Sequence, residues 1–236
     1  MSDGAPELTV IVPAFNEERT IEEVIRRVDE LPFSKQIIVV DDASEDRTAE
    51  LTAEVARAGG GSVELLRHDR NRGKGAALRT GFAQARGRVV VIQDADLEYD
   101  PVEIPELIRP ILEGHADVVF GSRLIGGRPQ RVHLFWHKAG NRFLSLVTNV
   151  LYNTTLTDME TGYKAFTLDV LRRIEPLRES DFRIEPEMTA KICRGGFRIY
   201  ELPISYYGRS YDEGKKITWR DGFPAMVALF RYRFRD

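Results

Sequence analysis

Short apolar runs rich in valine and isoleucine recur through the first half of the chain, and a stretch of helical length separates most of them from the next. These runs cover residues 8–12, 36–40, 62–66, 89–92 and 117–120. Unbroken runs of β-branched residues are typical of strands that are buried on both faces of a sheet. The segments between them carry apolar residues at helical spacing, as Ile21, Val24, Ile25 and Val28 do. This alternation predicts a single α/β domain with a mostly parallel central sheet flanked by helices.

The second half of the chain has a less regular pattern. We expect strands at residues 164–167, 198–202 and 204–207, and helices at residues 134–152, 168–174 and 185–193. The last stretch, residues 217–236, combines aromatic residues and arginines at helical spacing. Such a helix either docks on the core or lies in a membrane interface near anionic lipids, and the two arrangements are compatible. We therefore expect one domain over residues 1–216 and a C-terminal amphipathic helix over residues 217–236.

Composition narrows the class of protein. The 236 residues are 42% hydrophobic and 30% charged, with a net charge of -3, which indicates a globular protein and gives no general case for nucleic-acid binding. The single cysteine, Cys193, excludes an intramolecular disulfide and a cysteine-based metal cluster. The chain shows neither signal-peptide features nor an uncharged apolar stretch of transmembrane length. We expect a cytoplasmic protein, with peripheral contact at the cytoplasmic face of the membrane left open.

An Asp-x-Asp pair follows the buried run at residues 89–92. Alternate residues of an extended segment point the same way, so Asp94 and Asp96 can reach one point, and Glu98 can add a third carboxylate. The carboxyl end of a strand is where open α/β sheets bind ligands. Hard oxygen donors in this arrangement suit Mg²⁺ or Mn²⁺. The alternative interpretation of the pair is a solvated acidic turn.

Charged residues also stand at the ends or entries of other predicted elements. Asp41 and Asp42 follow the run at residues 36–40, so acid recurs at strand ends and predicts one ligand crevice. Lys74 stands between two glycines at a helix start, where a phosphate could bind, although a plain tight helix entry is the simpler explanation of the glycines. Arg123 follows a strand and could bind an anion or form a salt bridge with a neighbouring acid.

Several of these motifs, in this order and spacing, resemble family 2 glycosyltransferases with the GT-A fold. The resemblance is greatest to the dolichyl-phosphate mannose synthase branch, which includes bacterial polyprenyl-phosphate sugar synthases. The motifs that carry it are Pro13-Ala-Phe-Asn-Glu-Glu18, Asp41-Asp-Ala-Ser44, Asn71-Arg-Gly-Lys-Gly75, Asp94-Ala-Asp96, Gly121-Ser-Arg123, Asp158-Met-Glu-Thr-Gly-Tyr-Lys164 and Arg209 with Gly214-Lys-Lys216.

The resemblance implies roles for individual residues. The base and ribose of a nucleotide diphosphate sugar would be held by Pro13, Phe15, Glu17, Asp41 and Asp42. Asp94 and Asp96 would serve the metal and the diphosphate, and Glu98 stands where some relatives carry glutamine. Arg123 would lie near the phosphate of a lipid acceptor. The residues expected to close over the diphosphate are Arg209, Lys215 and Lys216, and we add Lys74 to this donor site.

The resemblance also implies the reaction, which is transfer of a hexose with inversion from GDP-mannose or UDP-glucose to a polyprenyl or dolichyl phosphate. A phosphate acceptor is largely ionised near neutral pH and needs arginines more than a base. A hydroxyl acceptor would need a base, for which Asp158 is the first candidate and Glu160 the second. The competing functions are transfer to a soluble or protein hydroxyl, nucleotidyl transfer, and non-catalytic binding of a nucleotide sugar.

Overall fold

The computed structural model describes residues 5–58, 61–132, 135–209 and 222–235. Its strands are β1 (Leu8–Ala14), β2 (Lys35–Asp41), β3 (Val63–Arg67), β4 (Val89–Ile92), β5 (Val118–Ser122), β6 (Lys164–Thr167) and β7 (Ile199–Pro203). Its helices are α1 (Ile21–Asp29), α2 (Thr48–Ala58), α3 (Lys74–Gln84), a 3₁₀ turn η1 (Pro101–Glu103), α4 (Ile104–Leu112), α5 (Phe135–Tyr152), α6 (Leu168–Ile174), α7 (Ile184–Arg194) and α8 (Gly222–Phe234). The predicted α/β class is confirmed.

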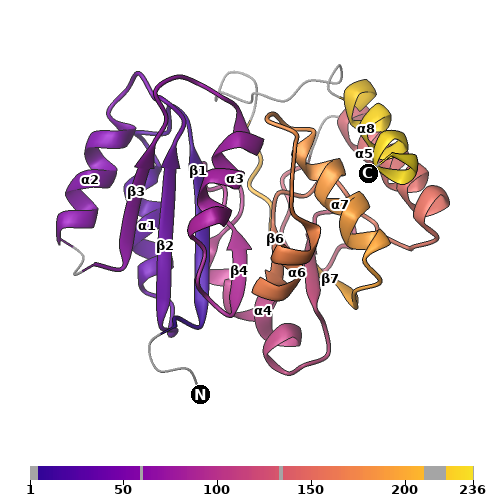
Figure 1. Ribbon diagram of the computed structural model, residues 1–236, viewed down its shortest axis with the longest axis horizontal. Helices are drawn as coiled ribbons and strands as arrows, with labels where there is room; N and C mark the ends of the chain where they lie inside the picture. Colours follow the sequence, from indigo (N-terminus) through magenta and orange to yellow (C-terminus); the bar gives the residue numbers. More distant parts are fainter. Residues whose placement is uncertain (1–4, 59–60, 133–134, 210–221, 236) are drawn as a thin grey trace.

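The described strands form one sheet in the order β3-β2-β1-β4-β6-β5-β7 (Figure 1). The pairs β1–β2, β1–β4, β2–β3 and β5–β7 are parallel, whereas β6 runs antiparallel between β4 and β5. From β1 the chain first adds β2 and β3 on one side and later adds β4 on the other. The loops after β1 and β4 therefore diverge, which leaves a crevice at the carboxyl ends of these two strands.

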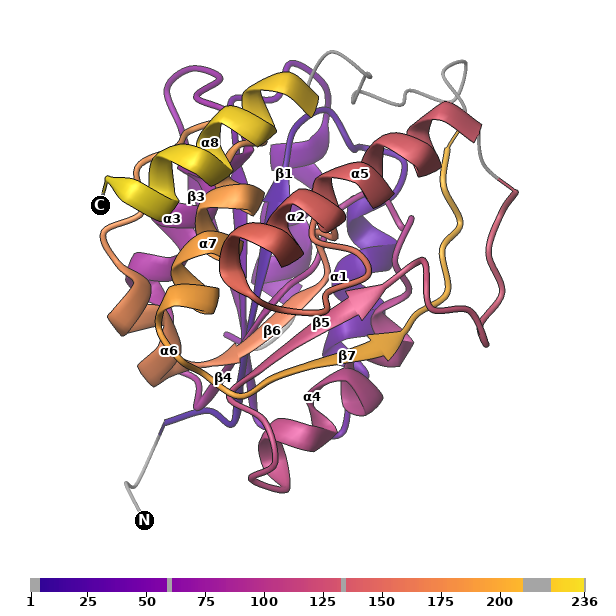
Figure 2. The same ribbon diagram turned by 90° about the vertical axis from the view of Figure 1, so that its right-hand side faces the viewer.

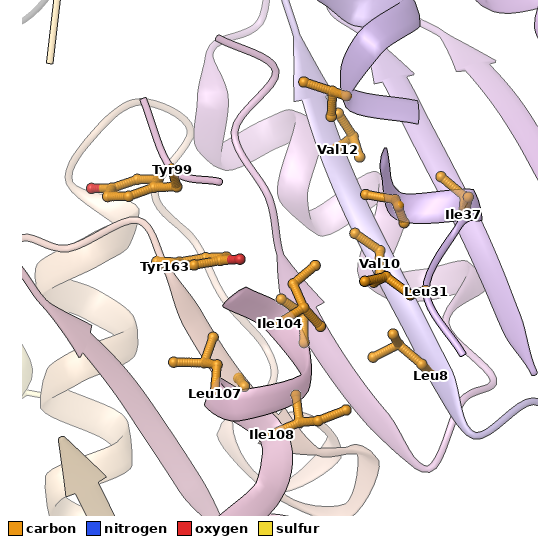
Figure 3. Packing of buried hydrophobic residues seen from close by; sticks show 14 of the residues in the cluster. Leu8, Val10, Val12, Leu31, Ile37, Tyr99, Ile104, Leu107, Ile108 and Tyr163 are labelled. Atoms are coloured by element: carbon orange, nitrogen blue, oxygen red, sulfur yellow. The ribbon is translucent and has the colours of Figure 1, made fainter. Parts of the chain in front are cut away.

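Helices cover both faces of the sheet. Along β1, Val10 and Val12 pack into one apolar cluster with α1 and α4, while Ile11 packs into the other cluster with α3, α6 and α7. Figure 3 shows the first cluster, in which Ile104 and Leu107 of α4 approach the strands. These strands are buried on both faces, which is why their sequence is an unbroken apolar run and not an alternating one.

Two further helices lie outside this sandwich. α8 packs against α5 and α7, and in Figures 1 and 2 α5 and α8 form the outermost layer on their side of the molecule. Ala225, Ala228, Leu229 and Tyr232 are the buried residues of α8. The C-terminal helix thus docks on the core, which is one of the two arrangements expected from its sequence.

The second half departs from the sequence expectation at one segment. The sequence predicts a strand at residues 204–207, but this segment forms only an isolated bridge between Tyr206 and Gln130. Ile204 still donates to the carbonyl of Ser122 at the end of β5, but Tyr206 donates to the carbonyl of Pro129 and Tyr207 to that of Glu98, both in loops. This segment carries the chain from β7 back over the carboxyl ends of the strands, toward Arg209.

Candidate active site at the carboxyl ends of β1 and β4

A cavity of about 950 Å³ lies at the crevice between the ends of β1 and β4. Residues from the loops after these strands form one part of its wall, and residues of α5, α8 and the loops after β5 and β7 form another. The predicted site residues that line it are Pro13, Phe15, Glu17, Asp42, Lys74, Asp94, Asp96, Glu98, Arg123 and Arg209. Two further predicted residues, Lys215 and Lys216, lie outside the described residues.

Asp41 and Asp42 differ in what they contact. The carboxylate of Asp41 is buried, accepts hydrogen bonds from Arg67 Nε and the Ser44 amide, and is absent from the cavity wall. Asp42 lines the cavity, where its carboxylate accepts hydrogen bonds from His68 Nδ1 at 2.6 Å and from the Gly73 amide at 2.7 Å. Asp42 is therefore the one of the two that the structure brings to the cavity.

Arg209 joins three acidic residues at one end of the cavity. Its guanidinium donates to Glu17 Oε2 and to Asp96 Oδ2, each at 3.0 Å, and its backbone amide donates to Glu98 Oε1 at 2.8 Å. Burial, reinforced by the nearby charges of Asp94 and Glu98, raises the pKa of Asp96 to about 7. The acidic residues are thus close enough to repel one another, and Arg209 partly compensates their charge.

The three predicted metal ligands do not form a preformed coordination site. Within the described ranges, no three histidine, cysteine, aspartate or glutamate side chains converge in a way that could hold a metal ion. The reason is that Glu98 accepts from the Tyr206 hydroxyl and the Arg209 amide, while Asp94 pairs with Lys74. Asp94 and Asp96 nevertheless both face the cavity with hard carboxylate oxygens, a donor type that suits Mg²⁺ or Mn²⁺ shared with a diphosphate.

Lys74 belongs to a buried chain of alternating charges. Its Nζ lies 2.8 Å from Asp94 Oδ1 and 3.2 Å from Glu185 Oε1, and Glu185 in turn pairs with the fully buried Lys164 at 2.6 Å. Burial opposes the charge of Lys74, but Asp94 and Glu185 raise its pKa above the usual value overall. Lys74 therefore presents a fixed positive charge beside the Asp-x-Asp pair.

The glycines beside Lys74 serve packing. A Cβ atom at Gly73 would lie 2.4 Å from the carbonyl oxygen of Ser180, and one at Gly75 would lie 2.5 Å from that of Glu179. Gly73 also has a φ of +90°, which side-chain-bearing residues rarely adopt. The alternative of a tight helix entry thus explains both glycines, since the backbone of residues 179–181 occupies the space that a side chain would need.

Arg123 and Asp158 form a buried ion pair. Asp158 is fully buried, and its Oδ2 accepts from Arg123 Nε at 2.6 Å while its Oδ1 accepts from Arg123 Nη2 at 2.7 Å and Asn141 Nδ2 at 2.8 Å. Burial opposes the charge of Asp158, yet Arg123 and these hydrogen bonds bring its pKa below the usual range. A carboxylate so engaged is a poor proton acceptor, and the geometry favours a positioning role for Asp158 over the role of base.

The wall formed by α5 and α8 carries large apolar side chains beside the polar residues His137, Lys138 and Asn141. Trp136, Phe143, Leu144, Phe223 and Met226 of α5 and α8 line the cavity, and Arg123 itself lies over the ring of Tyr206 at 5.2 Å from the centroid. The sequence pattern predicted the two helices but not their place over the cavity. Glu185 and Tyr206 were also missed as site residues, because each reaches the cavity through tertiary contacts and carries no local motif.

Comparison with known proteins places the chain in a family. The profile of glycosyl transferase family 2 matches residues 9–174. An uncharacterized protein of Methanocaldococcus jannaschii is 29% identical over 94% of this chain and 90% of its own length. The undecaprenyl-phosphate 4-deoxy-4-formamido-L-arabinose transferase of Pseudomonas aeruginosa is 31% identical over 90% of this chain and 61% of its own. The dolichol-phosphate mannosyltransferase of Pyrococcus furiosus is 30% identical over 88% of this chain and 58% of its own length.

A solved structure shares the fold. Glucosyl-3-phosphoglycerate synthase from Mycobacterium tuberculosis, in complex with Mn²⁺, uridine-diphosphate and phosphoglyceric acid, aligns with a TM-score of 0.70 at 18% identity over 97% of this chain and 79% of that chain. The chain spans about three fifths of the length of the two named lipid-phosphate transferases above. The family profile and these relatives confirm the resemblance seen in the motifs, and the chain belongs to glycosyl transferase family 2 and is a glycosyltransferase.

Proposed function

We propose that the protein transfers a hexose from a nucleotide diphosphate sugar, GDP-mannose or UDP-glucose, to a polyprenyl or dolichyl phosphate. The observation that carries this proposal is the composition of one cavity. Its end at β1 and β4 holds the Asp-x-Asp pair with Lys74 and Arg209, and its other end joins Arg123 to apolar side chains of α5 and α8. The first end suits a diphosphate, and the second suits a phosphate attached to a hydrocarbon chain.

The barrier to transfer lies mainly in the departure of the charged diphosphate, and the cations of the site act on that charge. A divalent ion held by Asp94 and Asp96 would neutralise part of it. Lys74 and Arg209 supply further positive charge from fixed positions, and Lys215 and Lys216 remain predicted contributors. Arg123, held in place by Asp158, keeps its Nη1 without a partner among the described residues and can orient an acceptor phosphate for attack with inversion.

Relatives support both substrates. Two of the relatives described above are named for transfer to undecaprenyl phosphate or dolichol phosphate. The solved structure with the same fold binds Mn²⁺ and a nucleoside diphosphate. Both properties agree with the arrangement of charged and apolar residues in this cavity.

The donor is tested by thermal unfolding of the protein with GDP-mannose, UDP-glucose, GDP or UDP, each with and without Mn²⁺. A ligand at about 100 times its dissociation constant adds about 2.7 kcal/mol to the free energy of unfolding, so the melting temperature rises measurably. We expect one base to stabilise the protein, and to do so more strongly with Mn²⁺. Equal stabilisation with and without Mn²⁺ would contradict the metal assignment, and no stabilisation by any nucleotide would contradict the proposed donor.

We further propose that the outer face of α5 and α8 rests on the membrane that carries the acceptor. Phe143, Leu146 and Val150 follow one another at helical spacing on α5, and Phe223, Val227, Phe230 and Phe234 do so on α8; all are at least 45% exposed. Large apolar residues beside arginines are typical of interfacial helices. Phe143 and Phe223 also line the cavity, so the same face leads to Arg123. No helix in the described part of the chain is long and apolar enough to cross a bilayer.

Flotation with lipid vesicles tests this face. We expect the protein to bind vesicles that contain anionic lipid and Val150→Glu or Phe230→Glu to weaken binding, because each variant places a charge in the apolar contact. Neither residue lines the cavity, so turnover of a short-chain acceptor in detergent should be retained. Val102→Glu is the matched control, because Val102 in η1 is an apolar residue whose exposure of 66% lies between those of Phe230 and Val150. Equal binding by all four proteins would contradict the proposed face.

A further inference from the structure

Glu160 is a site carboxylate that the proposed mechanism does not use. It lines the cavity, and its Oε1 is buried without a hydrogen-bond partner among the described residues. Burial, followed by the charge of Glu185, raises its pKa to about 7. A buried polar atom without a partner destabilises a protein unless another molecule completes its hydrogen bonds. Such an atom in a cavity wall therefore points to a ligand group.

The backbone on either side of Glu160 is held firmly. Lys164 Nζ, which is fully buried, donates to the carbonyl oxygens of Met159 and Thr161, the two neighbours of Glu160. Thr189 Oγ1 also donates to the Met159 carbonyl. These contacts fix the loop from within the core, so the carboxylate is presented to the cavity by a preorganised support.

The loop that carries Glu160 contacts both charged ends of the cavity. Two residues further on, a Cβ atom at Gly162 would lie 2.6 Å from Asp94 Oδ2 and 2.9 Å from Lys74 Nζ, so this loop abuts the proposed diphosphate end. Two residues before Glu160, Asp158 pairs with Arg123, so the same loop also reaches the proposed acceptor end. A sugar in transit from the diphosphate to an acceptor held by Arg123 must pass through the space between them.

The substrates offer few hydrogen-bond donors in that space. A diphosphate and an ionised acceptor phosphate present oxygens that only accept, and a prenyl chain presents no polar group. Above about pH 7 the Glu160 carboxyl is ionised and also only accepts, so it then needs a donor as its partner. The hydroxyl groups of the transferred sugar are the donors available there. We propose, on the basis of the function proposed above, that Glu160 accepts a hydrogen bond from a hydroxyl of the donor sugar and selects donors that carry it.

Calorimetric titration with and without the sugar isolates this contact. Wild-type protein, Glu160→Ala, Glu160→Gln and Glu160→Asp are titrated with the pairs UDP-glucose and UDP, and GDP-mannose and GDP, in Mn²⁺. Glu160→Ala should lower affinity for the nucleotide sugar about 10- to 100-fold, the effect of losing a hydrogen bond to a charged group, and leave affinity for the nucleoside diphosphate within about twofold. Glu160→Gln keeps an accepting oxygen, so its affinity for the nucleotide sugar should lie between those of wild type and Glu160→Ala. Glu113→Ala, an exposed carboxylate away from the cavity, is the matched control.

Turnover of monodeoxy sugar nucleotides provides the second measurement. The wild-type enzyme should discriminate against the analogue that lacks the bound hydroxyl, because this analogue leaves the Glu160 carboxylate without a hydrogen-bond donor. Glu160→Ala has no carboxylate at this position, so it should turn over both sugar nucleotides with similar efficiency. If Glu160→Ala binds the sugar nucleotide as tightly as wild type while UDP or GDP also binds normally, the assignment of Glu160 is overturned and the proposed function stands. If wild-type protein binds no nucleoside diphosphate, the proposed function is overturned, and the inference with it.

Discussion

Asp96→Asn is expected to lower the rate of sugar transfer by about 10²- to 10³-fold or more, the cost of removing a charged group that stabilises the transition state. Asp96 lies at the centre of the acidic end of the cavity, where it contacts Arg209 and follows β4 by only a few residues. An asparagine keeps the shape of the side chain but loses the negative charge needed to hold a divalent ion. The measurement is the transfer rate as a function of Mn²⁺ concentration.

The same substitution should leave the fold intact, with a pH dependence of known sign. The pKa of Asp96 is raised to about 7 in the folded protein, so its ionised form is disfavoured there. As pH rises from near 4 to near 7, the wild type therefore loses stability that the asparagine variant keeps. At pH 8 we expect the melting temperature of Asp96→Asn to equal or exceed that of wild type. At pH 4 we expect the two proteins to melt at similar temperatures.

Asp117→Asn serves as the matched control for the transfer rate, since Asp117 pairs with Arg198 at the opposite end of β5 from Ser122 and does not line the cavity. Normal turnover by Asp96→Asn with added Mn²⁺ would refute the assignment of Asp96 to the metal and diphosphate. Loss of the folded state at pH 8 would show instead that its ion pair with Arg209 is needed for stability.

Arg123→Ala is expected to lower the free energy of unfolding by about 3–5 kcal/mol, because it leaves the fully buried Asp158 without its ion-pair partner. Urea denaturation measures this loss. Arg198→Ala removes an arginine from the exposed pair with Asp117 and should cost far less. A loss no larger than that of Arg198→Ala would contradict the view that Asp158 depends on Arg123.

A double variant separates stability from transfer. Replacing both members, as Arg123→Met with Asp158→Leu, removes the buried charges together and should restore much of the lost stability. It should not restore sugar transfer, because no guanidinium remains to hold the acceptor phosphate. Recovery of transfer together with stability would show that the ion pair only supports the fold.

The sequence predicted those parts of the fold and the site that depend on a local pattern of residues. Unbroken apolar runs predicted β1, β2 and β4, and acid at the ends of β2 and β4 predicted a shared crevice, because parallel strands of one sheet end at the same edge. The family motifs also predicted most of the cavity wall. Asp41 and Asp42 show the limit of this reasoning, since adjacent residues on an extended chain point apart and only the fold determines which one faces the cavity.

Features that depend on contacts between distant segments could not be predicted in this way. A four-residue run such as β6 does not reveal its direction, and its antiparallel place between β4 and β5 follows from packing. The fully engaged carboxylate of Asp158 depends on Asn141 from α5 and Arg123 from the loop after β5. Glu185 appeared to be an ordinary acidic residue at a helix start, yet its burial links Lys74 to Lys164.

The position of Arg209 links the binding of the cation to the binding of the diphosphate. Its guanidinium acts as a built-in counter-ion for Glu17 and Asp96, so an incoming divalent cation competes with a charge that is already tethered to the chain. A diphosphate offers Arg209 a new anionic partner and thereby frees the carboxylates for the cation. Cation and diphosphate then assist each other's binding by the same factor, as thermodynamic linkage requires. An exchange of counter-ions at Arg209 would thus couple retention of the metal to the presence of the sugar donor.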